Sequence, residues 1–328
     1  MRVLVTGGAG YIGSHLVDHL FAEGHEVVVV DDLSTGRREN ITHLLDEERF
    51  RFVEGDICNP GLVADLVASS DLVYHLAAAV GVRHILSNPL RGIFTNVEGT
   101  ANVLKAAHLH KRRVLFASTS EVYGRSPHMP LKEDGDRVLG STKITRWSYS
   151  TAKALGEHLC FAYYAEGLPV SIVRYFNSYG PRMDPQGYSS VVANFIMQAL
   201  RGEPLTIHGD GQQSRCFTFV NDTVRGTVLA AEHPEALGEV FNIGSSVETT
   251  ILELAALVLE LTGAKSGLTY LPYEQVYGPN FEDPRRRVPD VSKARRVLGF
   301  QAQVPLREGL EETIRWFRRQ YSETLCKT

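Results

Sequence analysis

The chain has 328 residues, with 34 basic and 38 acidic side chains and a formal charge of −4, a balance that does not favour nucleic acid or an anionic membrane as a partner. With 43% hydrophobic and 22% charged residues it has ordinary globular composition, enough for one large domain or two closely packed ones. The four cysteines lack C-x-x-C spacing, so we expect neither a zinc site nor a disulfide framework. Because we find neither a secretory segment nor an apolar run of membrane-spanning length, we expect a cytoplasmic protein.

The N-terminal segment predicts a strand, a glycine turn and a helix. Residues 2–6 are mostly apolar, and the glycines that follow fit G-x-x-G-x-x-G ahead of a helical apolar pattern. Such a turn lets backbone approach a diphosphate closely and packs the helix tightly on the strand. We therefore expect a dinucleotide site that includes Gly7, Gly10, Tyr11, Ile12 and Gly13.

A second predicted strand, residues 26–30, ends at Asp31. An acid at this spacing accepts hydrogen bonds from an adenosine ribose and disfavours a 2′-phosphate, so the sequence predicts NAD rather than NADP. Arg37 and Arg38 follow closely, which weakens this preference, and a solvated turn at Asp31 and Asp32 is the alternative.

Further predicted strands alternate with helices along the chain. They cover residues 50–53, 71–75, 113–116, 170–174 and 240–243. This alternation predicts an α/β fold with a doubly wound parallel sheet, the Rossmann arrangement. Ligands of such sheets lie at the carboxyl ends of the strands. The further cofactor-binding candidates are Asp32, Ser34, Asp56, Ile57, Leu76, Ala77, Ala78 and Asn96.

The strand–helix alternation becomes irregular after about Arg174. We expect a dinucleotide-binding domain over 1–176, to which 214–244 returns, and a smaller α/β C-terminal substrate domain over 177–213 and 245–328. Helices are predicted over 96–108, 149–165, 191–201, 251–261 and 310–319.

Tyr149 and Lys153 lie four residues apart, which places them on one face of the predicted helix. A lysine ammonium beside the phenol, together with a nicotinamide cation, favours phenolate and brings the pKa of the tyrosine towards neutral pH. Such a tyrosine can take a proton from a sugar hydroxyl. An amphipathic helix with a packed Tyr and an exposed Lys is the structural alternative.

Thr119, Ser120 and Glu121 follow the strand at 113–116 and form a hydroxyl-rich turn with one acid. A turn of this composition fits either a reaction site or a simple strand-to-helix cap.

These motifs together resemble the extended short-chain dehydrogenase/reductase family of nucleotide-sugar epimerases, dehydratases and decarboxylases, over essentially the whole chain. The resemblance implies a tightly held NAD, with Thr119 and Tyr149 hydrogen-bonded to the C4 oxygen of the sugar and Asp56 near the adenine. It also implies a homodimer formed through a four-helix bundle, from the helices at 96–108 and 149–165. The implied substrate-binding residues are Thr119, Tyr149, Asn177, Arg182, Arg215 and Arg287.

Four segments resemble UDP-glucuronate decarboxylases more than other members of that family. The Thr119-Ser120-Glu121 triple is similar to these decarboxylases and to GDP-mannose dehydratases, while Arg146-Trp147-Ser148-Tyr149 resembles the aminoarabinose-pathway decarboxylase and apiose/xylose synthase. Arg215-Cys216-Phe217 and Arg286-Arg287-Val288-Pro289-Asp290 also look like decarboxylase motifs. The long glycine-proline insert of xylose-forming decarboxylases is missing before the tyrosine, so three outcomes remain open: UDP-xylose, release of a UDP-4-keto-pentose, or no decarboxylation at all.

The expected catalytic residues are Thr119, Glu121, Tyr149, Lys153 and Arg215. Oxidation at C4 of a uronate places its carboxylate β to a ketone, which favours loss of carbon dioxide. Arg215 would orient that carboxylate or contact the diphosphate, and Glu121 would handle the proton at C5 or water, or be only a helix-start acid. The alternatives for the UDP-sugar substrate are 4-epimerisation and 4,6-dehydration, and a catalytically idle NAD-binding regulator is a different class.

Overall fold

The structure, a computed structural model, describes residues 1–80, 88–185, 191–277 and 282–322. Its central feature is a seven-stranded sheet in the order β3-β2-β1-β4-β5-β6-β11, with every neighbouring pair parallel. This confirms the predicted doubly wound sheet, because the strand order reverses direction at β1 and β4. The strands are β1 (Arg2–Thr6), β2 (Glu26–Asp31), β3 (Phe50–Glu54), β4 (Leu72–His75), β5 (Arg113–Thr119), β6 (Val170–Tyr175) and β11 (Val240–Ile243).

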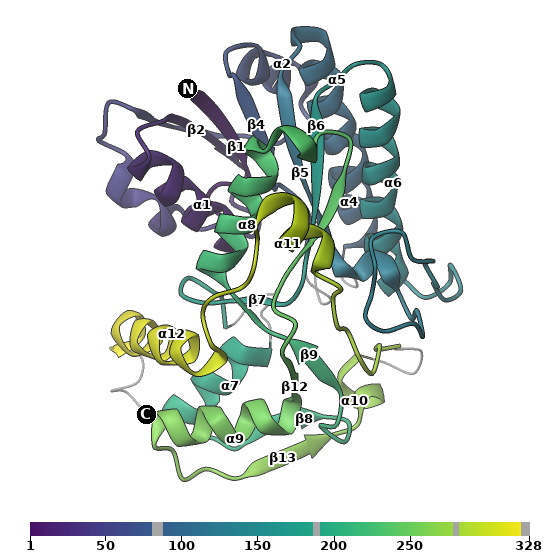
Figure 1. The fold of residues 1–328 in the computed structure, drawn as a ribbon. Coiled ribbons are helices and arrows are strands. Elements are labelled where there is room, and N and C mark those ends of the chain that lie inside the picture. The colour runs from purple at the N-terminus through teal and green to yellow at the C-terminus, as the bar shows by residue number, and fades with distance from the viewer. Residues whose placement is uncertain (81–87, 186–190, 278–281, 323–328) are drawn as a thin grey trace.

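Helices cover both faces of this sheet (Figure 1). On one face α1 (Tyr11–Ala22) packs beside α8 (Val220–Glu232), and on the other α5 (Thr100–His110) packs between α2 (Pro60–Ala68) and α6 (Arg146–Ala165). Shorter turns connect the larger elements and fix the loops at the strand ends. They are η1 (Arg38–Asn40), η2 (Thr42–Leu44), α4 (Pro89–Phe94), the π-helical η3 (Thr95–Gly99), η4 (Ser120–Tyr123) and η5 (Pro234–Ala236).

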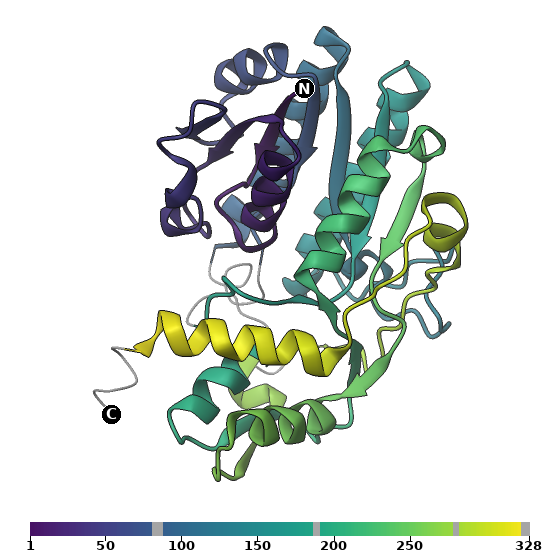
Figure 2. The same cartoon turned by 60° about the vertical axis from the view of Figure 1, so that its left-hand side comes forward.

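The C-terminal part lies beyond the carboxyl ends of the sheet strands, in the lower half of Figures 1 and 2. It has three two-stranded pairings, of which β8 with β13 and β7 with β10 are parallel and β9 with β12 is antiparallel. The strands are β7 (Ser178–Tyr179), β8 (Leu205–His208), β9 (Ser214–Cys216), β10 (Thr218–Phe219), β12 (Glu248–Thr250) and β13 (Leu268–Leu271). The helices of this part are α7 (Val191–Leu200), α9 (Ile251–Thr262), α10 (Tyr273–Tyr277) and α12 (Leu306–Gln320), whereas α11 (Ser292–Leu298) packs against β11 and α8.

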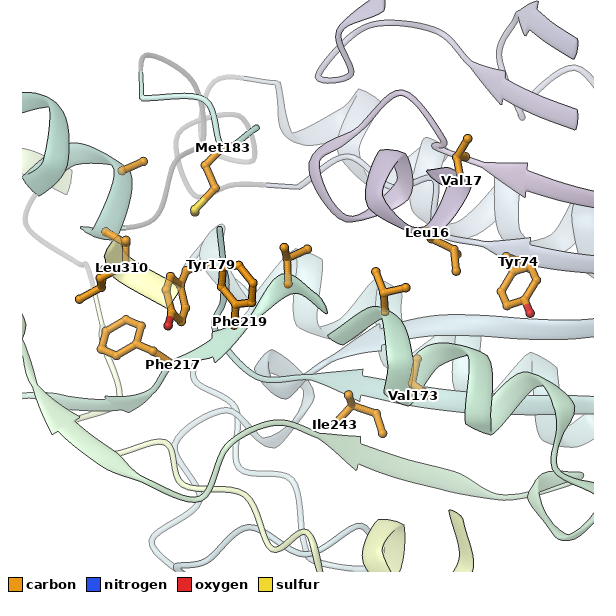
Figure 3. Packing of buried hydrophobic residues seen from close by; sticks show 14 of the residues in the cluster. Leu16, Val17, Tyr74, Val173, Tyr179, Met183, Phe217, Phe219, Ile243 and Leu310 are labelled. Atoms are coloured by element: carbon orange, nitrogen blue, oxygen red, sulfur yellow. The ribbon is translucent and has the colours of Figure 1, made fainter. Parts of the chain in front are cut away.

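One apolar cluster runs from the sheet into the C-terminal part. Val173 and Ile243 of the sheet belong to the same buried cluster as Phe217, Phe219 and Leu310, and Figure 3 shows this continuous row of side chains. Close packing of this kind resists relative movement, so the loops at the strand ends are held from both sides. This shared core crosses the domain boundaries proposed from the sequence, and those boundaries stay a prediction.

No helix within the described residues combines the length and apolarity needed to cross a bilayer. The same residues hold no group of three or more His, Cys, Asp or Glu side chains placed to bind a metal ion.

Candidate active site

A cleft of about 760 Å³ lies along the carboxyl ends of the central strands, where the loops after β1, β2, β3, β4, β5 and β6 converge. Ligands of open α/β sheets bind at this edge. Most of the residues predicted from the sequence line it: Gly7, Gly10, Tyr11, Ile12, Gly13, Asp31, Asp32, Ser34, Asp56, Ile57, Leu76, Ala77, Ala78, Thr119, Glu121, Tyr149, Lys153, Asn177 and Arg287. Three predicted residues do not line it, namely Asn96, Arg182 and Arg215.

The glycine turn presents bare backbone to one end of the cleft. A Cβ on Gly13 would lie 2.0 Å from the Gly7 carbonyl oxygen, and Gly7 itself has a φ of +73°. The helix α1 then begins at Tyr11 with no side-chain cap, so the backbone N–H groups of its first turn are available to a ligand. Such a turn fits the diphosphate of a dinucleotide, because backbone dipoles and the helix N-terminus favour anions.

Asp31 is held at the end of β2 by backbone donors. Its carboxylate accepts hydrogen bonds from the backbone N–H groups of Ala9, at 3.0 Å, and Leu33, at 2.9 Å. Burial raises the pKa of Asp31, although these N–H groups oppose the shift. The carboxylate lines the cleft one strand from the glycine turn, which fits an acceptor for ribose hydroxyls. Its neighbour Asp32 is paired with Arg91 at 3.0 Å.

Asn96 holds the loop after β4 instead of lining the cleft. Its side-chain oxygen accepts from the Ala79 backbone N–H at 3.0 Å, and its amide donates to the Ala79 carbonyl at 3.1 Å. The buried His75 ring, at the end of β4, supports the same loop. Its two nitrogens lie 2.8 Å from the Thr6 hydroxyl and 3.0 Å from the Thr100 hydroxyl. Burial lowers the pKa of His75 to about 3, so the ring is neutral at physiological pH and serves to hold this loop.

The turn after β5 carries Thr119, the candidate catalytic hydroxyl. Thr119 caps η4 by accepting from the Glu121 backbone N–H at 3.2 Å, and its hydroxyl also hydrogen-bonds the phenol of Tyr149. Ser150 donates to the Glu121 carbonyl at 2.7 Å, which fastens the turn to α6. The cap predicted for this turn is confirmed, whereas its interpretation as a reaction site stays a prediction, which the contact between Thr119 and Tyr149 supports.

Tyr149 and Lys153 both line the cleft, and the predicted shift of the tyrosine pKa towards neutral pH, which includes the charge of a nicotinamide cation, stays a prediction. Burial raises the pKa of Tyr149, the Glu121 carboxylate raises it further, and the Thr119 hydrogen bond only partly compensates. Lys153 donates to the Ala117 carbonyl at 2.8 Å, and burial lowers the pKa of its ammonium to about 8. The sequence argument counted the charge of a nicotinamide cation beside the phenol, and the protein's side chains do not supply an equivalent charge.

Glu121 lies between guanidinium groups. It accepts from Arg287 at 2.7 Å, and Arg146 lies 3.4 Å from its second oxygen. Burial alone would raise the pKa of Glu121, but the charges of Arg287 and Arg146 outweigh it and lower the pKa to about 2. The carboxylate is therefore ionised across the physiological range, next to Tyr149.

The three remaining substrate candidates have different surroundings. Arg215 donates to Asp283 at 2.7 Å and to the Ser214 carbonyl at 2.8 Å. Arg182 donates to Asp18 at 2.6 Å, on the outer side of α1. Asn177 lines the cleft, and its buried side-chain oxygen has no hydrogen-bond partner among the described residues, so it can accept from a ligand.

The buried Arg146 and the half-buried Asp283 lie beside the cleft and are absent from the sequence-based site. Arg146 contacts Glu121 and also Asp283, at 3.1 Å, and Asp283 in turn contacts Arg215. The segment that contains Arg146 resembles a family motif, but nothing in the sequence indicated that it meets Asp283.

The comparisons agree with this geometry. Residues 3–244 match the family model "NAD dependent epimerase/dehydratase family". A relative from Bacillus cytotoxicus, named UDP-N-acetyl-alpha-D-glucosaminuronate decarboxylase, is 43% identical over 317 residues, covering 97% of this chain and 98% of the relative. UDP-glucuronic acid decarboxylase 1 of Danio rerio is 40% identical over 322 residues, covering 97% of this chain and 73% of the relative.

Among solved structures, UDP-glucuronic acid 4-epimerase from Bacillus cereus, in complex with UDP-glucuronic acid and NAD, is similar with a TM-score of 0.87 and 34% identity. The match covers 98% of this chain and all of that one, at 100%. The fold, the glycine turn and the Tyr149–Lys153 pair thus occur together in a chain that belongs to the NAD-dependent epimerase/dehydratase family.

Proposed function

We propose that this protein is an NAD-dependent decarboxylase of a UDP-uronate, with UDP-glucuronate as the leading substrate and UDP-xylose or a UDP-4-keto-pentose as product. The observation that carries the proposal is the charge balance beside Tyr149. Arg146, Arg215 and Arg287 surround the acids Glu121 and Asp283, so three positive charges face two negative ones in a largely buried site. A substrate carboxylate would balance the remaining charge.

The cleft fits NAD. The bare glycine turn would hold the diphosphate, and Asp31 would bind the adenosine ribose. Lys153, which lies next to the end of β5, would contact the nicotinamide end. NAD supplies a hydride acceptor for C4 of the sugar when it is bound. We assign every other step to side chains of this chain.

The protein's own groups raise the pKa of Tyr149, so we assign its phenolate to the site with NAD bound, where the nicotinamide cation would favour it. As phenolate, Tyr149 would take the proton of the C4 hydroxyl, and Thr119, hydrogen-bonded to Tyr149, would orient the same oxygen. Once C4 is a ketone, the carboxylate at C6 is β to it and leaves as carbon dioxide. The bond electrons move to the C4 oxygen as an enolate, which hydrogen bonds from Thr119 and Tyr149 stabilise. Glu121, ionised at neutral pH, accepts a hydrogen bond from the water that reprotonates C5.

Arg287 is the guanidinium that lines the cleft, whereas Arg215 lies behind it on Asp283. We therefore propose Arg287 as the first group that meets the substrate carboxylate. Arg215, assigned from the sequence to that contact, would act through Asp283 or move on binding. Asn177, with its unpartnered oxygen, remains the proposed contact to the nucleoside diphosphate.

Epimerisation is the second candidate, because the Bacillus cereus neighbour is named a UDP-glucuronic acid 4-epimerase. Incubation with UDP-glucuronate distinguishes the two. Carbon dioxide and a pentosyl nucleotide support the decarboxylase, and UDP-galacturonate alone overturns it in favour of the epimerase. The same assay with the N-acetylglucosaminuronate analogue tests the substrate named for the 43% identical relative, and UDP-glucose tests for dehydration to a 4-keto-6-deoxy sugar.

Two variants connect the reaction to the site. Tyr149→Phe removes the proton acceptor, so we expect activity to fall by roughly 10²–10⁴-fold while NAD binding is retained. Glu121→Gln keeps the shape but removes the charge, and full-rate decarboxylation by this variant would leave the turn with a mainly structural role. A catalytically idle regulator would show no turnover with any of these nucleotide sugars.

We further propose a homodimer and a cytoplasmic location. Leu90, Ile93 and Phe94 of α4 and Leu155 of α6 are exposed on two helices that pack together, an apolar surface that a second copy of the chain would cover. Cys58, Cys160 and Cys216 are free thiols, which suits a reducing compartment.

A further inference from the structure

Five charged side chains form an alternating row beside Tyr149. Arg215 lies 2.7 Å from Asp283, Asp283 lies 3.1 Å from Arg146, Arg146 lies 3.4 Å from Glu121, and Glu121 lies 2.7 Å from Arg287. The five side chains are between 6% and 21% exposed, so water screens these interactions poorly. Each acid therefore lies between two arginines, and each contact affects the next.

Arg146 occupies the centre of this row. Of the described residues in it, Arg146 alone touches both acids, and it lies on α6 three residues before Tyr149. Glu121 belongs to η4, while Asp283 and Arg287 belong to the segment that follows α10. Arg146 thus joins the reaction turn to the C-terminal part.

The neighbouring contacts strengthen that connection without touching Glu121. The Trp147 indole N–H donates to Glu282 at 3.0 Å, and Arg125 pairs with the same carboxylate at 2.9 Å. The segment from 282 to 287 is therefore attached to α6 at two adjacent positions. At one of them, Arg146, the attachment also reaches the acid of the reaction site.

We propose that Arg146 is a positioning residue for Glu121, holding its carboxylate beside Tyr149 and linking that placement to Asp283 and Arg215. Arg146 does not line the cleft, so it acts through Glu121 and not on the substrate. This inference rests on the role that the proposed function gives to Glu121. Without Arg146, Glu121 would keep its ion pair with Arg287, and Asp283 would keep its contacts with Arg215 and the Tyr273 hydroxyl, but no side chain of the row would join the two acids.

The expected signature is a change in the pH profile. The charged or titratable groups facing Glu121 are Arg146, Arg287, the more distant Arg215, and the Tyr149 phenol. Removing one adjacent positive charge raises the pKa of Glu121, because an opposite charge at this distance lowers a carboxyl pKa by about one unit or more. A change that only loosened the fold would not shift this titration.

The test measures kcat and KM against pH with UDP-glucuronate for wild type, Arg146→Met and Arg146→Lys. Arg125→Met is the matched control, since it removes an arginine that holds the same segment through Glu282 and not through Glu121. We expect Arg146→Met to move the acidic limb of kcat upward by about one pH unit, with kcat reduced roughly 10- to 100-fold and KM changed less. Arg146→Lys should recover part of both effects, and Arg125→Met should keep the wild-type profile. A profile of Arg146→Met that superimposes on wild type, or an equal shift in Arg125→Met, would overturn the proposal.

A second measurement does not depend on turnover. Unfolding free energies of Arg146→Met, Glu121→Gln and the double variant form a cycle, in which coupled residues destabilise less together than the sum of their single effects. Additive effects would overturn the link between the two residues. If the wild type releases no carbon dioxide from UDP-glucuronate, the proposed function is wrong. The cycle of unfolding free energies then still tests whether Arg146 and Glu121 are coupled. Should Arg146→Met not fold, Arg146→Lys replaces it in the cycle.

Discussion

Arg174 and Glu157 form a bidentate ion pair directly behind the reaction turn. Arg174 Nε and Nη2 donate to the two carboxylate oxygens of Glu157 at 2.9 and 2.6 Å, and both side chains are buried. Ser118, which lines the cleft, donates to the same carboxylate, and Arg174 also donates to the Tyr123 hydroxyl at 2.8 Å. The pair thus supports the end of β5 from which Thr119 and Glu121 project.

Removing one partner of this pair should strongly destabilise the protein. We expect Arg174→Met to lower the free energy of unfolding by about 3–5 kcal/mol, because it leaves a buried carboxylate uncompensated. Urea denaturation measures the effect. The control is Arg307→Met, which removes a solvent-exposed pair with Glu260 and should cost at most about 1 kcal/mol. Similar losses in both variants would contradict a special role for the buried pair.

Glu121 should make part of the stability pH-dependent. Its pKa is lowered from 4.5 to about 2 in the folded protein, so its contribution is fully present above about pH 4.5 and is lost as pH falls towards 2. Protonated Glu121 resembles glutamine in charge. We therefore expect the difference in unfolding free energy between wild type and Glu121→Gln to be largest near neutral pH and to shrink in acid.

Chemical denaturation between pH 7 and pH 3 checks this prediction. Between pH 7 and pH 3, the difference in unfolding free energy between wild type and Glu121→Gln should shrink by at most about 3 kcal/mol, the value that follows from the pKa shift of Glu121. Other carboxyls also make stability depend on pH. Glu248 is one of them, because a hydrogen bond from Arg286 lowers its pKa to about 2. Comparing two proteins that differ at one residue cancels these contributions to the pH dependence of the unfolding free energy. A difference that stays constant with pH would show that Glu121 is not the titrating group.

Gly13 should be intolerant of any side chain. In Gly13→Ala the new Cβ would lie 2.0 Å from the Gly7 carbonyl oxygen, so the turn must open and lose its fit to a diphosphate. We expect NAD affinity, measured by calorimetry, to fall at least about tenfold, which corresponds to about 1.4 kcal/mol. Gly267→Ala is the matched control, since nothing lies within 4 Å of its Cβ position. Unchanged NAD affinity in Gly13→Ala would contradict the placement of the diphosphate.

The apolar face on α4 and α6 should control assembly. We expect Leu155→Glu to convert the proposed dimer into monomers, because it places a charge where a second copy would bury an apolar side chain. Light scattering after gel filtration measures the mass. Val247→Glu alters an equally apolar side chain, 67% exposed, in the C-terminal part and should leave the mass unchanged. A monomeric wild type, or equal effects of both substitutions, would rule out this interface.

Local patterns were enough to predict the parallel sheet and the cofactor side of the cleft. The glycine spacing, the acid at the end of β2 and the Tyr149–Lys153 pair all depend on residues close in sequence, so their geometry follows from strand and helix periodicity. Helix ends were less accurate. The helix predicted over 96–108 begins as the π-helical turn Thr95–Gly99, and no local signal indicated that change.

The arrangement of charges around Glu121 required the tertiary structure. Its partner Arg287 is 166 residues away, and Arg146 meets Asp283 only because the segment after α10 folds back onto α6. Sequence alone therefore named Arg287 and Arg215 as substrate residues without showing that one lines the cleft and the other lies behind it. Sequence alone also did not indicate that burial and the Glu121 carboxylate, which comes from another element, both raise the pKa of Tyr149. Periodicity fixes which residues share a helix face or a strand end, whereas long-range packing decides which charges meet.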